Sequence, residues 1–476
     1  MIFTKKLLAC FSVLIITSPA YSSGIEHLPA TLEYNLDLKI DYNTQKLYGT
    51  CEITMSNITE EPIKNVPVLL YRLLSVKSVK DGNNVPLSFG QEVVSIYNWE
   101  QIQVNFIEIA LDKPLLPGEQ DIIRLDYEGY LFGYSAEGWR YVKDHIARDF
   151  TLIRTDGFGY PVICNPDDRD LNYMVQQKFD YQINITVPAG MIVVTGGKLI
   201  DKTLKGDEIT YTFYSKKPSY RIDIAISDYK TLEEGKNKVH YFAGDSLSAR
   251  KVMNALQTSI ELYTGWFGPL DNYQGFSIIE VPEGYSSQQD VAAIILSAEN
   301  FRGSDDMRVI YHEIAHSWNV TSLDPQPSRF ESEGYAMFLQ TLLLEKLDNR
   351  KDMVSAEAQN FLNRIRNTFS ENEEYQTIPI KDYGVKGMTN YSYTLGMVVF
   401  AIFYDIIGQE CFNEIIGSFY LAHHTEGATL EDFIDHCKKT APVNLENFFN
   451  DWIYTTNGIK FVVEGKTFEE LKEYYN

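Results

Sequence analysis

Basic and sulfur-containing side chains are scarce in this 476-residue sequence. Lysine and arginine together number 42, against 65 aspartates and glutamates, and the formal net charge is −23. An acidic chain repels the phosphates of nucleic acids and of anionic lipid headgroups, so we expect neither as a partner. Only five cysteines occur, and no two of them have the spacing of metal ligands. The sequence therefore offers no cysteine-based metal site.

Long apolar runs are also missing beyond the first residues, since none approaches the ~20 residues of a membrane-spanning helix. We therefore predict no membrane span. Residues 1–22 resemble a cleavable signal peptide, in which Lys5 and Lys6 form the charged end and residues 7–16 the apolar stretch. We expect an exported protein, periplasmic or secreted. A lipoprotein anchor at Cys10 is less favoured, because the apolar stretch continues past it.

Export would permit disulfide bonds among the four cysteines that remain after processing. Cys411 and Cys437 fall on two predicted C-terminal helices and form the first pair to test. The alternative is that most of the four are buried thiols.

Two periodicities divide the chain. From 24 to 232, alternating or β-rich runs such as YNLDLKIDY and FDYQINITV are separated by turn signals, which predicts an antiparallel β domain. From 233 to 476, apolar residues mostly recur at helical spacing, with a short β stretch near the start. The predicted fold class is multidomain α+β, a β domain followed by a mostly helical domain with a small sheet.

The run VIYHEIAHSWNV, at residues 309–320, places His312 and His316 four residues apart in an otherwise largely apolar segment. In a helix these side chains project from one face, one turn apart, and both imidazoles can bind one ion. Glu313 is rotated by about 100° from His312, which suits a carboxylate that holds a water molecule rather than the metal. Two buried histidines without a ligand would cost several kcal/mol, so the spacing predicts one Zn²⁺ ion.

A catalytic zinc needs a third protein ligand and one open position. The next predicted helix, within SRFESEGYAMFLQTLLLEKL, offers two glutamates. Ser328 and Glu331 have the S-x-x-E spacing of a capping box, which gives Glu331 a local role at the helix start. Glu333, two residues on, points to another side of the helix. We therefore predict Glu333 as the third ligand.

HEIAHSW followed by SEGYA resembles the gluzincin zinc peptidases of the aminopeptidase N family. The spacer between His316 and Glu333 has 16 residues, whereas the family usually has 18. The order of the strand-like runs is similar to the family's N-terminal β saddle, and the end of the chain is similar to the end of its thermolysin-like domain. The resemblance thus implies a β saddle or sandwich and a thermolysin-like catalytic domain, without the family's C-terminal helical domain. HSWNV also resembles the related glycyl aminopeptidases.

The resemblance implies further site residues. Tyr393 in NYSYTLG matches the family's Tyr-x-x-Gly segment, whose phenol binds the oxyanion of the tetrahedral intermediate; Tyr391 is the near alternative. The family also has a glutamate, before the zinc helix, that binds the substrate's α-amine. Here Asp290 falls at its place, with Gln288 and Gln289 beside it. An aspartate that caps a turn is the structural alternative for Asp290.

Together these residues predict an exported zinc metallopeptidase that acts on peptides, most simply an aminopeptidase. His312, His316 and Glu333 would hold the zinc ion, Glu313 would act as general base, and Tyr393 would stabilise the oxyanion. An endopeptidase or oligopeptidase, a glycyl-aminopeptidase-like enzyme, a non-catalytic peptide-binding protein and a hydrolase of a non-peptide substrate remain open. Neither side-chain preference nor oligomeric state follows from the sequence.

Overall fold

The computed structural model describes residues 28–135, 139–140, 142–175, 177–285, 287–289, 292–303, 307–348 and 350–475. The predicted signal peptide, residues 1–22, and Asp290 lie outside the described residues.

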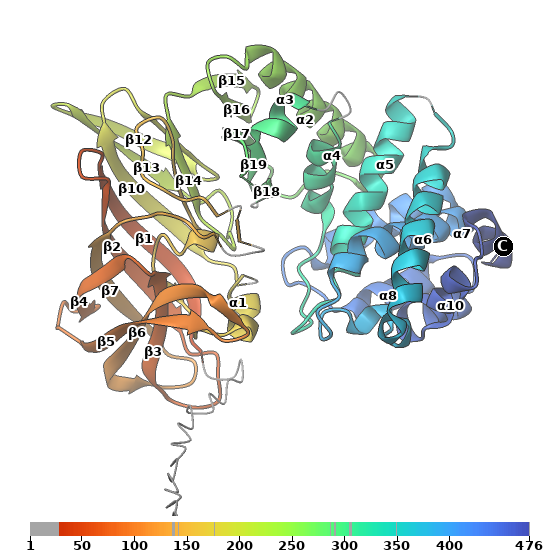
Figure 1. The fold of residues 1–476 in the computed structure, drawn as a ribbon, viewed down its shortest axis with the longest axis horizontal. Coiled ribbons are helices and arrows are strands. Elements are labelled where there is room, and N and C mark those ends of the chain that lie inside the picture. The colour runs from red at the N-terminus through yellow and green to blue at the C-terminus, as the bar shows by residue number, and fades with distance from the viewer. Residues whose placement is uncertain are drawn as a thin grey trace, which may run out of the picture.

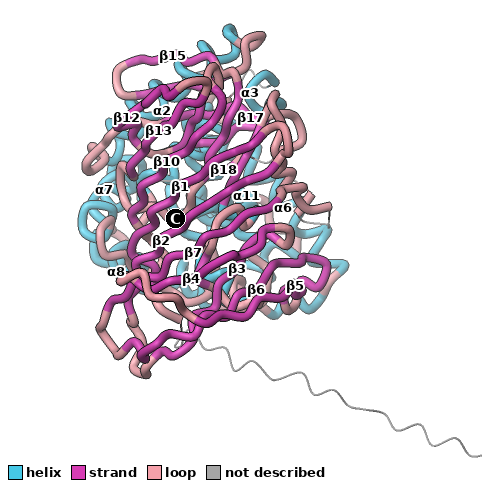
Figure 2. The backbone as a smooth tube through the Cα atoms, turned by 90° about the vertical axis from the view of Figure 1, so that its left-hand side faces the viewer, coloured by secondary structure: helices cyan, strands magenta, loops and turns pink. Residues whose placement is uncertain are grey.

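Alternating strands build the first part of the chain into one broad twisted sheet (Figure 2). Its seven strands are, in spatial order, β12 (Lys198–Lys205), β13 (Glu208–Tyr214), β10 (Asp180–Pro188), β1 (Ala30–Asp41), β2 (Lys46–Ser56), β7 (Gln120–Gly129) and β4 (Leu74–Asp81). In β10 every second side chain is buried, as the period of a half-buried strand requires. One neighbouring pair, β1 with β10, is parallel, so the sheet is not purely antiparallel.

Two smaller sheets complete the β domain. One contains β5 (Ser88–Ile96), β6 (Trp99–Leu115), β3 (Ile63–Tyr71) and β9 (Val162–Ile163), and the other contains β11 (Ile192–Thr195), β14 (Asp223–Ser227) and β8 (Thr151–Arg154). The short helices η2 (Thr155–Gly157) and α1 (Asp168–Met174) lie between their strands in the sequence. A large apolar cluster joins the seven-stranded sheet to both smaller sheets, and none of the sheets formed by the described residues closes into a barrel.

A five-stranded sheet follows and bridges the β domain and the helices (Figure 1). Its spatial order is β15 (Lys230–Glu234), β16 (Asn237–Tyr241), β17 (Ser277–Val281), β19 (Ala293–Ser297) and β18 (Gln288–Gln289). The predicted small sheet is therefore present, with β18 as its edge strand. The predicted boundary between residues 232 and 233 falls inside β15, and the division by residue number stays a prediction.

Helices make up the rest of the chain. They are α2 (Ser246–Phe267), α3 (Ala298–Gly303), α4 (Arg308–Ala315), η3 (His316–Trp318), η4 (Phe330–Gly334), α5 (Tyr335–Leu347), α6 (Met353–Glu371), η5 (Glu373–Thr377), η6 (Ile380–Asp382), α7 (Asn390–His423), α8 (Leu430–Thr440), α9 (Glu446–Phe449), η7 (Asn450–Tyr454), α10 (Asn457–Val463) and α11 (Phe468–Tyr475). One apolar cluster runs through them and reaches the five-stranded sheet. The fold is multidomain α+β, as predicted.

The long helix α7 lies at the centre of this cluster. Its 34 residues and mean hydropathy of 1.5 in the most apolar window would allow a membrane span by length and composition alone, but 61% of that window is buried inside the protein. Gly408 has non-helical backbone angles and divides α7 into two shorter helices. We therefore interpret α7 as a core helix.

The four cysteines within the described residues are free thiols, so Cys411 and Cys437 form no disulfide bond here. Cys51, Cys164 and Cys437 are buried, which agrees with the alternative of buried thiols.

Candidate metal centre and active site

The structure brings together the three predicted metal ligands. His312 lies in α4, His316 begins η3, and Glu333 lies in η4. The Nε2 atoms of the two histidines are 3.2 Å apart. Glu333 Oε2 lies 3.3 Å from His312 Nε2 and 3.5 Å from His316 Nε2. Within the described residues this is the one group of three or more histidine, cysteine, aspartate or glutamate side chains that could hold a metal ion.

The dimensions of this triangle fit zinc. In a tetrahedral site the nitrogen and oxygen ligands lie ~2.0–2.1 Å from the ion, so any two of them are ~3.3–3.4 Å apart. The three distances, 3.2, 3.3 and 3.5 Å, match that spacing. The side chains of His312 and His316 also keep 12% and 16% of their surface exposed, so solvent can reach a fourth position. Two imidazoles and one carboxylate thus form a compatible donor set for one Zn²⁺ ion.

Electrostatics keep the Glu333 carboxylate ionised. Burial works against its charge, but hydrogen bonds from His312 and His316 and the charge of Arg329 lower its pKa far below its ordinary range. A carboxylate must be deprotonated to bind a metal ion, and this condition is met at any physiological pH.

A close backbone contact positions the third ligand. Glu333 lies in a single turn of π-helix that precedes α5, a conformation frequent at functional sites. The next residue, Gly334, meets Gly396 of α7 so closely that a Cβ on Gly334 would lie 2.6 Å from the Gly396 Cα. Two glycines are therefore required where the π turn crosses α7. Because Gly396 lies three residues after Tyr393, the same contact brings that tyrosine to the ligands.

Glu331 faces away from the metal ligands, in agreement with the choice of Glu333. It lines a small cavity with Trp318 and Phe400. In a capping box, Ser328 Oγ would accept the backbone N–H of Glu331. Here Ser328 Oγ accepts the backbone N–H of Phe330 at 3.3 Å and contacts the side chain of Glu331 instead of its backbone, so the predicted capping box is not formed. The reason is local, because Arg329 has a left-handed backbone conformation and is followed by a π turn instead of a regular α-helical turn.

Two side chains that sequence reasoning missed support the ligands. Asn319 Oδ1 lies 2.9 Å from His316 Nδ1, and its amide donates to the Glu331 carbonyl at 2.9 Å. Such a partner orients the ring so that Nε2 faces the metal. Arg329 donates to Glu333 Oε1, the oxygen that does not face the histidines. Its i,i+4 spacing from Glu333 is a signal that the sequence already contained.

Glu313 is partly buried beside the triangle. Burial raises its pKa, and the negative charge of Glu333 adds to the rise, whereas His312, His316 and Arg221 lower it. A carboxyl whose pKa is raised accepts a proton more readily, which suits a general base.

Tyr393, rather than Tyr391, faces the metal site. The Tyr393 ring stacks on His312, with 6.4 Å between centroids and 7° between planes. Burial and the charge of Glu333 raise the pKa of its phenol well above the ordinary value, so the hydroxyl keeps its proton and can donate it in a hydrogen bond. Tyr391 instead packs against Phe369 and Tyr375, away from the ligands.

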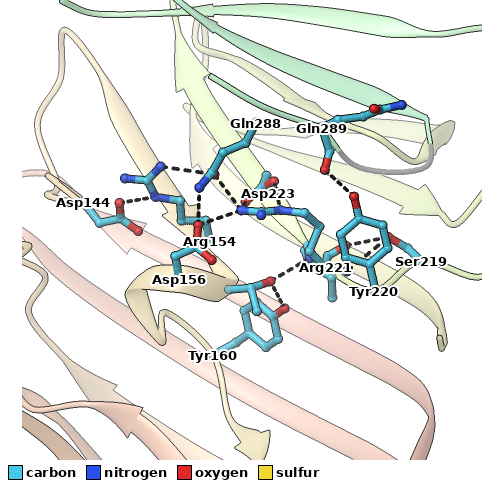
Figure 3. A network of polar contacts seen from close by, with 12 residues as sticks. Asp144, Arg154, Asp156, Tyr160, Ser219, Tyr220, Arg221, Asp223, Gln288 and Gln289 are labelled. Carbon is cyan, nitrogen blue, oxygen red and sulfur yellow. Dashed lines mark hydrogen bonds and ion pairs between the residues drawn. The ribbon is translucent and has the colours of Figure 1, made fainter. Parts of the chain in front are cut away.

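A buried ionic network lies where the β domain meets the small sheet (Figure 3). Arg221 pairs with Asp223 at 2.6 Å and with Asp156 at 3.0 Å. Arg154, with no exposed surface, pairs with Asp144 at 2.8 Å. Each charge has an opposite partner, as burial requires. The sequence did not reveal this network, because its members are dispersed over β8, η2 and β14 and the segments beside them.

The edge strand β18 connects this network with the predicted substrate-binding segment. Gln288 donates to Asp156 at 2.5 Å and accepts from Arg221 at 2.7 Å, so both ends of its amide are occupied. Gln289 accepts the Tyr220 hydroxyl on its backbone oxygen at 2.6 Å, as Figure 3 shows, while its buried Oε1 atom has no hydrogen-bond partner within the described part of the chain. Asp290 lies outside the described residues, so its predicted role stays a prediction.

Comparison with known proteins agrees with this geometry. Residues 293–452 match the peptidase family M1 domain. The chain is similar in structure to an M1 zinc metallopeptidase from Deinococcus radiodurans, with 18% identity and a TM-score of 0.65 over 89% of this chain and 94% of that chain. Comparison with curated proteins gives no match.

Two liganded structures show the same similarity of fold. One is a mutant of the Deinococcus radiodurans M1 zinc metallopeptidase bound to a Tyr-Ser-Ala substrate, with 19% identity and a TM-score of 0.64 over 89% of this chain and 94% of that chain. The other is a mutant two-domain M1 zinc metallopeptidase bound to L-arginine, with 17% identity and a TM-score of 0.65 over 92% of this chain and 95% of that chain.

Proposed function

The chain carries a peptidase family M1 domain with a complete set of zinc ligands and is a zinc metallopeptidase, and from this premise we propose that it is an exported aminopeptidase that releases N-terminal residues from peptides. The observation that carries the peptidase assignment is the triangle of His312, His316 and Glu333 with Glu313 beside it. The two liganded structures of similar fold support the choice of aminopeptidase, since one holds a tripeptide substrate and the other a free amino acid.

His312, His316 and Glu333 would hold the ion. When bound, zinc supplies a Lewis acid that polarises the scissile carbonyl and lowers the pKa of water. Glu313 takes the proton of the attacking water and passes it to the leaving amine, a transfer that the raised pKa of its carboxyl favours. Tyr393 keeps its proton and donates a hydrogen bond to the oxyanion that forms on the substrate.

The role of Glu313 is tested by Glu313→Gln, which keeps the shape of the side chain and removes the base. We expect the variant to bind zinc as the wild type does and to lose nearly all turnover of aminoacyl fluorogenic substrates, because general-base catalysis contributes about 10²–10⁴-fold. Metal content by elemental analysis is the control. Wild-type turnover in a zinc-loaded variant would remove Glu313 from the mechanism.

The choice between aminopeptidase and endopeptidase is tested with one peptide in two forms, with a free and with an acetylated N-terminus. An aminopeptidase must recognise the ammonium group, so we expect cleavage of the free form only. Equal cleavage of both forms would show that the enzyme is an endopeptidase or oligopeptidase.

Export is tested by the N-terminus of the mature protein. The predicted signal peptide ends at Ser22, so we expect the protein recovered from the periplasm or medium to begin at Ser23. Protein that stays in the cytoplasm with Met1 intact would contradict export.

A further inference from the structure

Arg329 makes two contacts at the metal centre that the mechanism above does not use. Its guanidinium donates to Glu333 Oε1, while Glu333 Oε2 faces the two histidines. The two oxygens of the ligand are thus divided between the arginine and the metal site.

The same guanidinium lies over the ring of Tyr393, with 5.7 Å between its carbon and the ring centroid. The same ring also contacts His312, with 6.4 Å between the ring centroids. An arginine above an aromatic face is attracted by the ring, and its planar fork can bind a carboxylate at the same time. One side chain therefore touches both the metal ligand and the predicted oxyanion donor.

The backbone is specialised for this placement. Arg329 has φ 62° and ψ 10°, a left-handed conformation that is uncommon for a long side chain. Its carbonyl accepts the Glu333 N–H at 2.8 Å, so arginine and glutamate lie one above the other across the π turn. An unfavourable backbone conformation that is kept beside a functional site is a sign of a role at that site.

An ordinary surface ion pair is the alternative, and burial distinguishes the two. In the pair Arg250–Glu234 the side chains are 59% and 30% exposed. In the pair Arg329–Glu333 the carboxylate is only 7% exposed, although the arginine is 47% exposed. A desolvated carboxylate is held more tightly by a charged partner than one in water.

We propose that Arg329 is a positioning residue of the metal centre, which presents Glu333 to zinc through Oε2 alone and holds the Tyr393 ring in place. This inference rests on the zinc site of the proposed function. It assigns Arg329 no contact with substrate and no proton transfer.

The test measures zinc affinity by competition with a chromophoric chelator, together with kcat and KM for an aminoacyl substrate. Arg329→Met removes the charge and the fork. Arg329→Gly removes the side chain and suits the left-handed backbone, so it keeps the test valid if the methionine variant folds poorly. Arg329→Lys keeps the charge without the planar fork, and Arg250→Met is the matched control at a remote ion pair.

Removing a partner of a metal ligand commonly weakens metal binding by about 10–100-fold. We expect a loss of that size in Arg329→Met and Arg329→Gly, a smaller loss in Arg329→Lys, and none in Arg250→Met. We expect kcat to fall with little change in KM, since Arg329 contacts Glu333 and Tyr393 rather than the peptide.

Wild-type zinc affinity in both Arg329→Met and Arg329→Gly would overturn the proposal. A rise in KM with unchanged zinc affinity would also overturn it, because the arginine would then bind substrate. Zinc affinity is measured without peptide, so a wild-type protein that cleaves no peptide, but whose Arg329 variants lose zinc, would refute the proposed function and leave this inference standing.

Discussion

Gly396→Ala is expected to separate the two elements that carry Glu333 and Tyr393. A Cβ on Gly396 would lie 2.7 Å from the Gly334 Cα, in the crossing of α7 and the π turn. Carbon atoms in contact lie ~3.5 Å or more apart, so the two backbones must move apart by about 0.8 Å. The atom that the new Cβ would meet belongs to the backbone of Gly334, which cannot move aside as a flexible side chain can. The displacement therefore passes to Glu333, the metal ligand, and to the phenol of Tyr393.

Two magnitudes follow from this shift. Overpacking costs about 1–3 kcal/mol, and alanine returns about 1 kcal/mol of helix propensity, so we expect a loss of up to about 2 kcal/mol in the free energy of unfolding. Catalysis suffers more, because a 1 Å misplacement in an active site can cost about 100-fold. We expect kcat to fall by about 10–100-fold in a protein that still folds.

The assay is kcat for an aminoacyl substrate, with thermal unfolding measured on the same samples. Gly265→Ala is the control, because Gly265 lies in α2 with open space around its Cβ position. That variant should gain up to about 1 kcal/mol of stability and keep full activity. Wild-type kcat in Gly396→Ala would refute the argument that this glycine contact positions the site.

Three further predictions concern buried charge and metal. Burial raises the pKa of Glu280 to about 7, so the folded protein holds this proton more tightly than the unfolded chain. The free energy of unfolding should then fall by up to about 3 kcal/mol as pH rises from about 4.5 to 7. Urea unfolding of Glu280→Gln should show a correspondingly smaller fall, and an equal slope in both proteins would contradict this. Asp144→Asn removes the buried ion pair between Asp144 and Arg154 and should cost about 3–5 kcal/mol in chemical denaturation; a cost below about 1 kcal/mol would show that this ion pair contributes little to stability. Chelation of zinc should lower the melting temperature, since zinc at a free concentration 100 times its Kd stabilises the folded state by about 2.7 kcal/mol. An unchanged melting curve would show that the site holds no metal.

Short-range patterns already specified much of this protein. Strand alternation predicted the β domain, helical spacing predicted α4, and i,i+4 geometry predicted that His312 and His316 share one ion. These features depend on the local geometry of the chain, in which residues two, three or four apart have a fixed relation. For this reason they could be read without knowing what packs against them.

Contacts between distant segments could not be read in this way. The parallel pairing of β1 with β10, the ion pairs of Arg154 and Arg221, and the edge strand that carries Gln288 depend on how separate elements dock. Periodicity says which face of a strand is buried, but it does not say which strand is the neighbour.

The sequence by itself thus determined that His312 and His316 project from one face of a helix and that Glu313 follows the first of them. Only the tertiary structure decided that Glu333 reaches them through a π turn against Gly396, that Arg329 holds the other carboxylate oxygen, and that Tyr393 faces the site. The physical reason is range, because backbone geometry fixes relations within one helical turn, whereas relations between elements follow from the packing of side chains that lie far apart in the sequence.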